Sequence, residues 1–185
     1  MRMKRMNSLR KLVTMVMCAA LLFAAATVNA GSASAAGAAS NPDGNYTLTL
    51  PGSPHAQQAI INPVVVSGDE LTVNYKTFDR KIDLGLGELT YRGYVTGVTL
   101  TYVNADGDTV TVPITSEAYT GVGTTSSYSG YTKFNVAGVD ITDTDFTIEF
   151  DVVLYLYAFG RTWPPALPHP AISVTSATFS GPLAP

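Results

Sequence analysis

The segment from Phe146 to Tyr157 constrains the fold more than any other part of the sequence. Its even-numbered residues, from Phe146 to Leu156, are all apolar. Alternate side chains of a β-strand point to opposite faces, so this period of two predicts a long strand with one face in the core. The odd-numbered residues are polar up to Asp151 and apolar from Val153 onward. We therefore expect this strand to be covered on both faces at its C-terminal end.

Similar alternation or β-branched runs recur along the chain, separated by turn residues. They are found at Asn45–Leu50, Ile60–Val66, Leu71–Tyr75, Val98–Tyr102, Val110–Ile114, Thr132–Val136 and Ala171–Phe179. Helical periodicity is almost absent and is confined to a short turn at Ser53–Ala59. Many short strands with such spacing predict an all-β fold, an antiparallel immunoglobulin-like β-sandwich of about eight strands with one short helical turn.

The N-terminal region predicts a secretory signal peptide. Five of the eleven Lys and Arg residues lie within the first eleven positions, and an apolar run from Leu12 to Ala26 follows. That run is shorter than the ~20 residues needed to span a bilayer, and small residues offer cleavage after Ala30 or Ala35. Favouring Ala35, we expect a signal peptide at 1–35, a flexible leader at 36–44, the sandwich domain at 45–180 and a tail at 181–185.

The composition of the remaining chain excludes several classes of protein. This part of the chain contains six Lys and Arg residues and all fourteen Asp and Glu residues. Its net charge of −8 argues against nucleic-acid binding. The single cysteine, Cys18, lies in the apolar run and would be removed with it, which excludes disulfides and thiol chemistry. No second hydrophobic span follows. We expect a secreted, extracellular protein with no membrane span, attached to a cell wall non-covalently if at all.

Catalytic signatures are weak, and we expect no enzyme activity. His55 and His169 are the only histidines, no Gly-x-Ser-x-Gly elbow exists, and most acids occupy turns. Whether two carboxylates meet in space, as in a glycosidase, is not readable from spacing. The Gly/Ser/Thr-rich stretch Tyr119–Tyr131 is typical of a mobile loop, and its tyrosines are alternatively an adaptable contact surface.

The C-terminal region offers two interpretations of the two-faced strand end. Tyr155 and Tyr157, together with Val153, form its second apolar face. A neighbouring loop containing Trp163 and several prolines covers this face in the first interpretation. In the second, the face lines a slot for a flat ligand or a protein partner. His169 lies at the foot of the returning strand.

The order of motifs between Asp43 and Phe179 resembles a known family. The motifs are an opening Asp43-Gly44-Asn45-Tyr46, a short lip at Ser53–Ile61, a strand pair at Pro63–Val66 and Glu70–Lys76, a strand at Lys133–Val136 and a last hairpin at Phe146–Phe179. In this order they are similar to the NEAT (near-iron-transporter) domain of Gram-positive bacteria. The resemblance rests on pattern and order.

The resemblance implies a haem site between the lip and the last hairpin. In the family a tyrosine of a Tyr-x-x-x-Tyr motif in the final strand ligates the iron, and this sequence lacks that motif. Phenolate or imidazole can take the axial position, so Tyr157 or His169 is the expected ligand. Ser53 and Arg161 would contact the propionates. Tyr155 and Trp163 complete the expected cofactor-binding residues.

Three functions follow from these observations. The first is a secreted haem-binding protein of iron acquisition, with haem or a haemoprotein as its partner. The second is a cofactor-free immunoglobulin-like interaction or adhesion module, which contacts other cell-surface proteins or a wall polymer through the Val153–Tyr157 patch. The third and weakest is carbohydrate binding, with Trp163 as a stacking platform.

Overall fold

A computed structural model of the chain describes residues 41–83, 85, 87–121 and 128–184, and the expected signal peptide lies outside these ranges. The described residues confirm the all-β fold, with eleven strands where about eight were predicted. The strands are β1 (Gly44–Thr49), β2 (Ile60–Ser67), β3 (Glu70–Tyr75), β4 (Phe78–Asp83), β5 (Glu88–Val103), β6 (Thr109–Thr111), β7 (Ile114–Thr120), β8 (Ser129–Asn135), β9 (Phe146–Ala158), β10 (Arg161–Pro168) and β11 (Ile172–Ser180).

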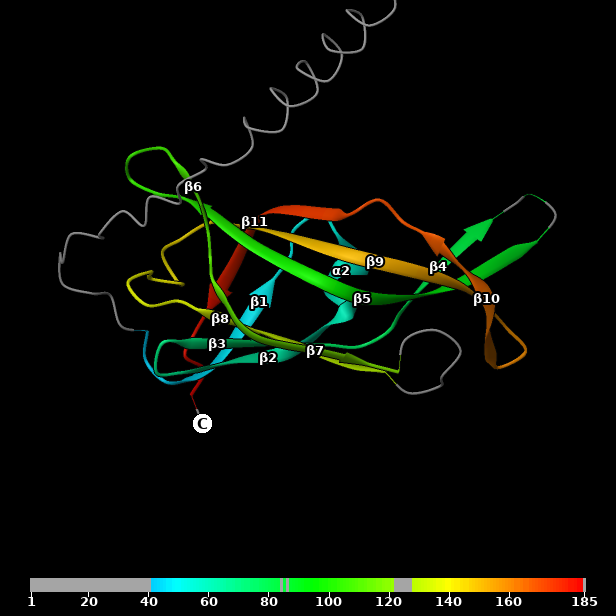
Figure 1. Ribbon diagram of the computed structural model, residues 1–185, viewed down its shortest axis with the longest axis horizontal. Coiled ribbons are helices and arrows are strands. Elements are labelled where there is room, and N and C mark those ends of the chain that lie inside the picture. Colours follow the sequence, from blue (N-terminus) through cyan, green and yellow to red (C-terminus); the bar gives the residue numbers. More distant parts are fainter. Residues whose placement is uncertain (1–40, 84, 86, 122–127, 185) are drawn as a thin grey trace, which may run out of the picture. The chain divides into compact units, whose positions relative to one another are not determined.

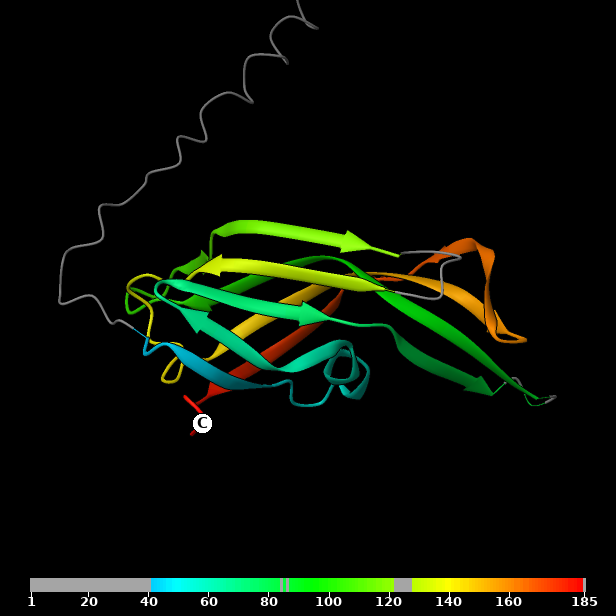
Figure 2. The same ribbon diagram turned by 90° about the horizontal axis from the view of Figure 1, so that it is seen from below.

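The strands form two layers in which every pairing is antiparallel (Figures 1 and 2). The first sheet has the order β1-β2-β3-β8-β7, and the second has the order β4-β5-β9-β11. Strand β1 joins the two sheets, because its first half pairs with β2 and its second half with β11. The short β6 pairs with β5, and β10 pairs with the C-terminal part of β9 beyond the end of β11.

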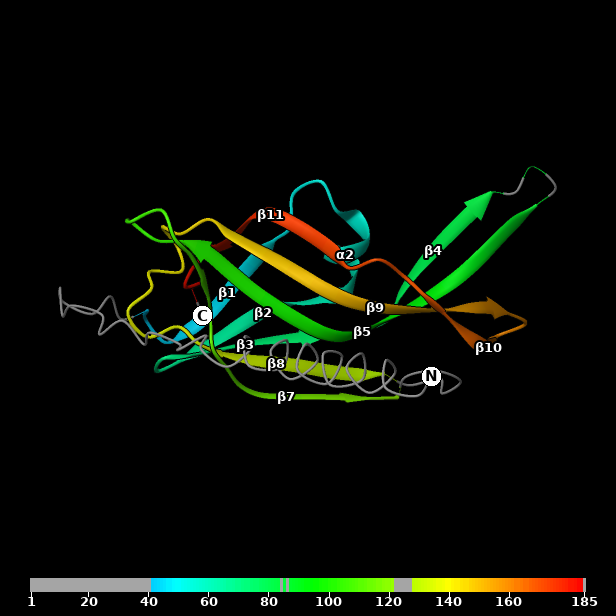
Figure 3. The ribbon, with the colours of Figure 1, turned by 45° about the horizontal axis from the view of Figure 1, so that its top comes forward.

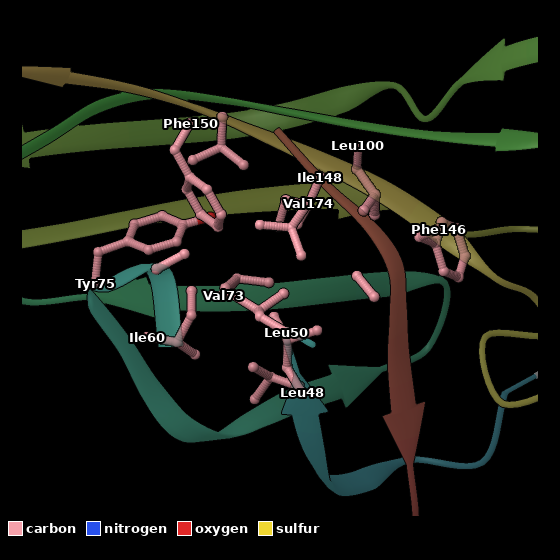
Figure 4. Packing of buried hydrophobic residues seen from close by; sticks show 14 of the residues in the cluster. Leu48, Leu50, Ile60, Val73, Tyr75, Leu100, Phe146, Ile148, Phe150 and Val174 are labelled. Carbon is pink, nitrogen blue, oxygen red and sulfur yellow. The ribbon is translucent and has the colours of Figure 1, made fainter. Parts of the chain in front are cut away.

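The core lies between the two sheets and includes the predicted apolar face of β9. Phe146 and Phe150 are buried, as expected from the period of two. Tyr75 of β3 meets Phe150 of β9 edge to face, with ring centroids 6.2 Å apart, and so connects the two layers (Figure 4). Phe146 makes a second edge-to-face contact with Phe179 at 5.5 Å. These aromatic pairs add geometric preference to the apolar burial that stabilises the sandwich.

The expected helical turn is present as α2 (Pro54–Ala59). Proline at the first helical position suits the start of a helix, and Ala56 and Ala59 are buried. The helix packs against β4, where the ring of His55 lies 6.2 Å from that of Phe78. Within the described ranges, no helix is long and apolar enough to cross a membrane.

Four strand segments were missing, wholly or in part, from the sequence-based prediction. No strand was predicted over β4 or the first half of β5, β7 was predicted only in part, and β10 was assigned to a loop. Charges in β4 and prolines in β10 mask the alternation, and such residues are typical of edge strands. The predicted loop at Tyr119–Tyr131 is wrong at both ends, because β7 continues to Thr120 and β8 begins at Ser129. Residues 122–127 lie outside the described residues.

Residues in the predicted leader and in the predicted tail are hydrogen-bonded to the sandwich. Asn41 was assigned to a flexible leader, yet it is only 8% exposed. Its side-chain amide donates to the carbonyl of Val139 and accepts from the backbone N–H of Ile141. At the other end, the N–H of Leu183 donates to the carbonyl of Asn45 at 2.7 Å. The ordered domain therefore begins by residue 41 and includes part of the predicted tail.

Candidate functional site

Four strand segments continue past the part of the second sheet that pairs with β11. The pairing of β9 with β11 ends at Phe150, and the pairing of β9 with β10 begins at Val153. On the other side of β9, β5 continues in register and carries β4 on its far edge. We call this four-stranded region the extension. It comprises β4, residues 88–94 of β5, residues 153–158 of β9, and β10, and it lies at the opposite end of β5 from β6 (Figures 1 and 3).

Strand register assigns the aromatic side chains of the extension to two opposite faces. Directly paired residues share a face. One cross-strand row therefore contains Arg80, Tyr91, Leu156 and Trp163, on what we call the tryptophan face. The adjacent residues form what we call the tyrosine face, with the rows Asp79, Arg92, Tyr155 and Lys81, Thr90, Tyr157, Thr162.

The exposed part of the tyrosine face is organised around Arg92. Its guanidinium lies 3.7 Å from the centre of the Tyr157 ring, a cation–π arrangement. Asp79 holds the same guanidinium through two hydrogen bonds, of 2.9 and 3.0 Å, and this pairing raises the pKa of Arg92. The bidentate geometry fixes the orientation of the arginine. One face of the Tyr157 ring is therefore already occupied.

Toward the sandwich, the tyrosine face becomes a packed aromatic cluster. The rings of Tyr155 and Tyr128 both meet the fully buried Tyr94 edge to face, at 5.6 and 5.4 Å. The Tyr128 hydroxyl donates to the carbonyl of Val95 and so connects the β7–β8 region to β5. Burial raises the pKa of Tyr128, and it raises that of Tyr119 to about 12. These phenols are neutral at physiological pH and act as structural groups.

The tryptophan face carries the second arginine–aromatic pair. Arg161 lies 3.8 Å from the centre of the Trp163 ring, and the indole N–H donates to the carbonyl of Ala158 at 3.1 Å. The interpretation that a loop containing Trp163 covers the second apolar face of the strand end is therefore wrong. Trp163 does not cover Tyr155 and Tyr157, because it lies on the other side of the sheet. Tyr94 and Arg92 provide the contacts on the tyrosine face instead.

His169 lies on the side of the tryptophan face. Its Nδ1 is 2.6 Å from the carbonyl oxygen of Pro170, so we assign the ring proton to Nδ1. Its Nε2 then accepts a hydrogen bond from Nη1 of Arg80 at 2.8 Å. A backbone carbonyl that fixes the tautomer in this way is typical of histidines that present Nε2 to a metal. In this structure Arg80 occupies that position.

The six predicted site residues fall into two groups. Ser53 is the N-cap residue of α2, with no side-chain capping bond, and α2 packs against Phe78 on the tryptophan face. Arg161, Trp163 and His169 belong to the same side. Tyr155 and Tyr157 lie on the opposite face. A single flat ligand therefore cannot contact all six, and the residues fit haem only in part, on the side of His169.

No family model, curated protein or solved structure matches the chain. The resemblance to NEAT domains therefore stays a prediction, carried by the order of the motifs.

Sequence reasoning missed two residues that organise the extension, Arg80 and Arg92. Both were hidden because β4 and the first half of β5 had not been recognised as strands. One signal was available, since five of the six Lys and Arg residues beyond position 40 lie at Lys76–Arg92 or at Arg161. Clustering of that kind indicates a common surface.

A hollow of about 610 Å³ lies at the opposite end of the second sheet, among the β5–β6 turn, the loop before β9 and the register irregularity in β11 after Val174. Asp140, Asp143 and Asp145 line it. The Asp140 carboxylate accepts hydrogen bonds from Thr142 and Asp143, which hold its pKa below the usual value. In the part of the chain that the structure describes, no three His, Cys, Asp or Glu side chains group to hold a metal ion.

Proposed function

We propose that this chain is an exported immunoglobulin-like binding module and that the extension is its recognition surface. The proposal is supported by the partial exposure of the aromatic side chains there and by their stacking against arginines. Tyr155, Tyr157 and Trp163 are half-buried, and two of them lie beneath arginine guanidiniums. Tyr, Trp and Arg are the residues that most often dominate the binding energy of interfaces.

The pre-formed arginine–aromatic pairs also favour recognition for an energetic reason. A guanidinium that already rests on a ring, as Arg92 does on Tyr157, loses little rotamer freedom when a partner binds. The ion pair with Asp79 restricts it further. The extension therefore presents rigid, amphipathic groups on a β-scaffold, in the way that a recognition surface requires.

We expect Tyr157→Ala and Trp163→Ala each to weaken binding to the producing organism's cell surface by about thirtyfold or more, because truncated interface hot spots cost at least ~2 kcal/mol. The measurement is equilibrium binding of the fluorescently labelled exported chain to intact cells. Tyr131→Ala is the matched control, since Tyr131 is also half-buried but lies on β8 in the other sheet. Equal binding by all three variants, each shown to be folded by thermal unfolding, would contradict the proposal.

Haem binding is the second candidate, and the geometry of His169 is the observation that favours it. The Nδ1–H bond to Pro170 leaves the Nε2 lone pair facing the side of α2 and the tryptophan face, where Arg80 now meets it. Ser53 and Arg161 belong to the same side. Bound haem would supply a ferric centre to be captured and passed on, and these residues would bind and orient it.

The two proposed iron ligands make opposite predictions. On titration with hemin we expect a Soret shift that His169→Ala abolishes and Tyr157→Phe leaves in place, because Tyr157 lies on the other face beneath Arg92. Absorbance spectra of the exported chain and the two variants measure this. A wild-type chain with no Soret shift, or a shift that survives in His169→Ala, contradicts haem binding through this histidine.

A further inference from the structure

The tip of the extension carries a residue that the fold does not explain. Phe159 joins β9 to β10 and is 95% exposed. Its φ of 54° lies in the left-handed region, and Gly160 follows with a φ of 73°. Two-residue turns of this kind favour Asn, Asp or Gly at both positions. A phenylalanine here therefore adds backbone strain to the cost of a solvated ring, and such a combination points to function.

Further apolar groups and a cation lie on β10 behind the tip. Leu167 is 40% exposed, and the segment between it and Trp163 consists of exposed prolines and alanine. Arg161 is exposed two residues after Phe159 and stacks on Trp163. An exposed apolar apex followed by Trp and Arg is the order of groups that suits a membrane interface, with the apex in the acyl region and the others among the headgroups.

Charge is distributed unequally between the extension, taken together with the residues that flank it, and the rest of the domain. Residues 76–93 and 153–170 contain five Lys and Arg against three acids, a net charge of +2. The remaining residues from 41 onward contain Lys133 alone against eleven acids, a net charge of −10. Within the extension, Lys81 pairs with Glu88 and Arg92 with Asp79. Among the described residues this leaves Lys76, Arg80 and Arg161 with no carboxylate in an ion pair.

We propose that the tip of the extension docks on an anionic phospholipid surface, with Phe159 inserted and Arg161 at the headgroups. Charge complementarity selects the partner, because only this end of an otherwise strongly acidic domain is cationic. The Debye length is about 8 Å at physiological salt, so a body that stands back from the surface is only weakly repelled. The isolated, protruding ring distinguishes a lipid surface from a soluble polyanion, which would be bound by the cations alone.

This inference rests on the proposed function, since it names a partner for the same surface. The test is sedimentation of the exported chain with vesicles of phosphatidylcholine containing a quarter phosphatidylglycerol, and with vesicles of phosphatidylcholine alone. We expect binding to the anionic vesicles only. Phe159→Ala should lower the partition coefficient about tenfold through lost apolar burial, and Arg161→Gln about fivefold through lost headgroup attraction.

Two matched controls lie outside the extension. Ile114→Ala removes an apolar side chain that is 45% exposed on β7, and Lys133→Gln removes a cation on β8. Neither should change the partition coefficient. Binding that is absent, that does not depend on phosphatidylglycerol, or that falls equally in the controls overturns the proposal.

Soluble polyphosphate distinguishes the alternative partner. If it binds as tightly as the vesicles do, and Phe159→Ala has no effect on either, the site recognises polyanions and the lipid proposal is wrong. Loss of vesicle binding alone leaves the proposed function standing, provided that Tyr157→Ala and Trp163→Ala still weaken binding to cells. Failure of both experiments removes the extension as a recognition surface.

Discussion

Replacing Phe150 with alanine should lower the free energy of unfolding by about 3–5 kcal/mol, the usual cost of removing a buried phenylalanine ring. Phe150 is 1% exposed and meets Tyr75 across the two sheets. Its removal therefore leaves a cavity in the core as well as losing the transfer free energy of the ring. Since domains of this kind are stable by only about 5–15 kcal/mol, the loss should be a large fraction of the total.

Equilibrium urea denaturation measures this difference, and the chain supplies its own control. Phe159→Ala removes the same side chain from a position that is 95% exposed. The change in unfolding free energy there should stay within about 0.5 kcal/mol. Equal losses in the two variants would show that Phe150 does not connect the two sheets as described.

Gly93→Ala should destabilise the domain by about 1–3 kcal/mol, the range for overpacking a well-filled site. A Cβ at position 93 would lie 2.3 to 2.7 Å from three ring atoms of Phe78. That ring is only 4% exposed and packs beneath α2, so it has little room to move. The expected consequence is displacement of β4, and with it Arg80 and Asp79, from the edge of the extension.

A neighbouring glycine and a double variant test this explanation. At Gly97 of β5 an added Cβ would meet the Oδ2 atom of Asp151 at 2.7 Å, but that carboxylate is exposed and can rotate away. Gly97→Ala should therefore cost much less. Combining Gly93→Ala with Phe78→Leu should cost less than the sum of the single variants, as measured by denaturation. Strict additivity would rule out the clash as the cause.

The resemblance leaves two candidate iron ligands, and the geometry of the extension favours one of them. The resemblance implies a site between a lip and the last hairpin, Phe146–Phe179. The structure has α2 within the lip, and β9 pairs with β11 as expected but also with the inserted strand β10. The missing Tyr-x-x-x-Tyr motif leaves His169 and Tyr157 as candidates, and the structure separates them on opposite sides of one sheet. Only His169 shares a side with Ser53 and Arg161. Hemin titration of the two variants is therefore decisive for that candidate.

The period of two let the sequence predict most of the sandwich. Apolar residues at alternate positions identify the core face of β9 and of β3 without knowledge of their partners, because burial of a strand face depends on side-chain direction alone. The same reasoning failed for β4 and β10. Charges such as Arg80 and Lys81, and the prolines of β10, are tolerated there because one edge of each strand is free of the ladder.

What the sequence by itself determined is the set of chemical groups at the C-terminal end: the tyrosines of β9, the single tryptophan and a cluster of cations in an acidic chain. Only the tertiary structure decided which of these side chains lie on the same face of the sheet. The two-residue turn at Phe159 places Trp163 opposite Leu156 and Thr162 opposite Tyr157. A register shifted by one residue would move Trp163 to the tyrosine face, because side chains alternate with a period of two. The assignment of one binding surface or two therefore depends on pairing between strands, which no single strand's sequence specifies.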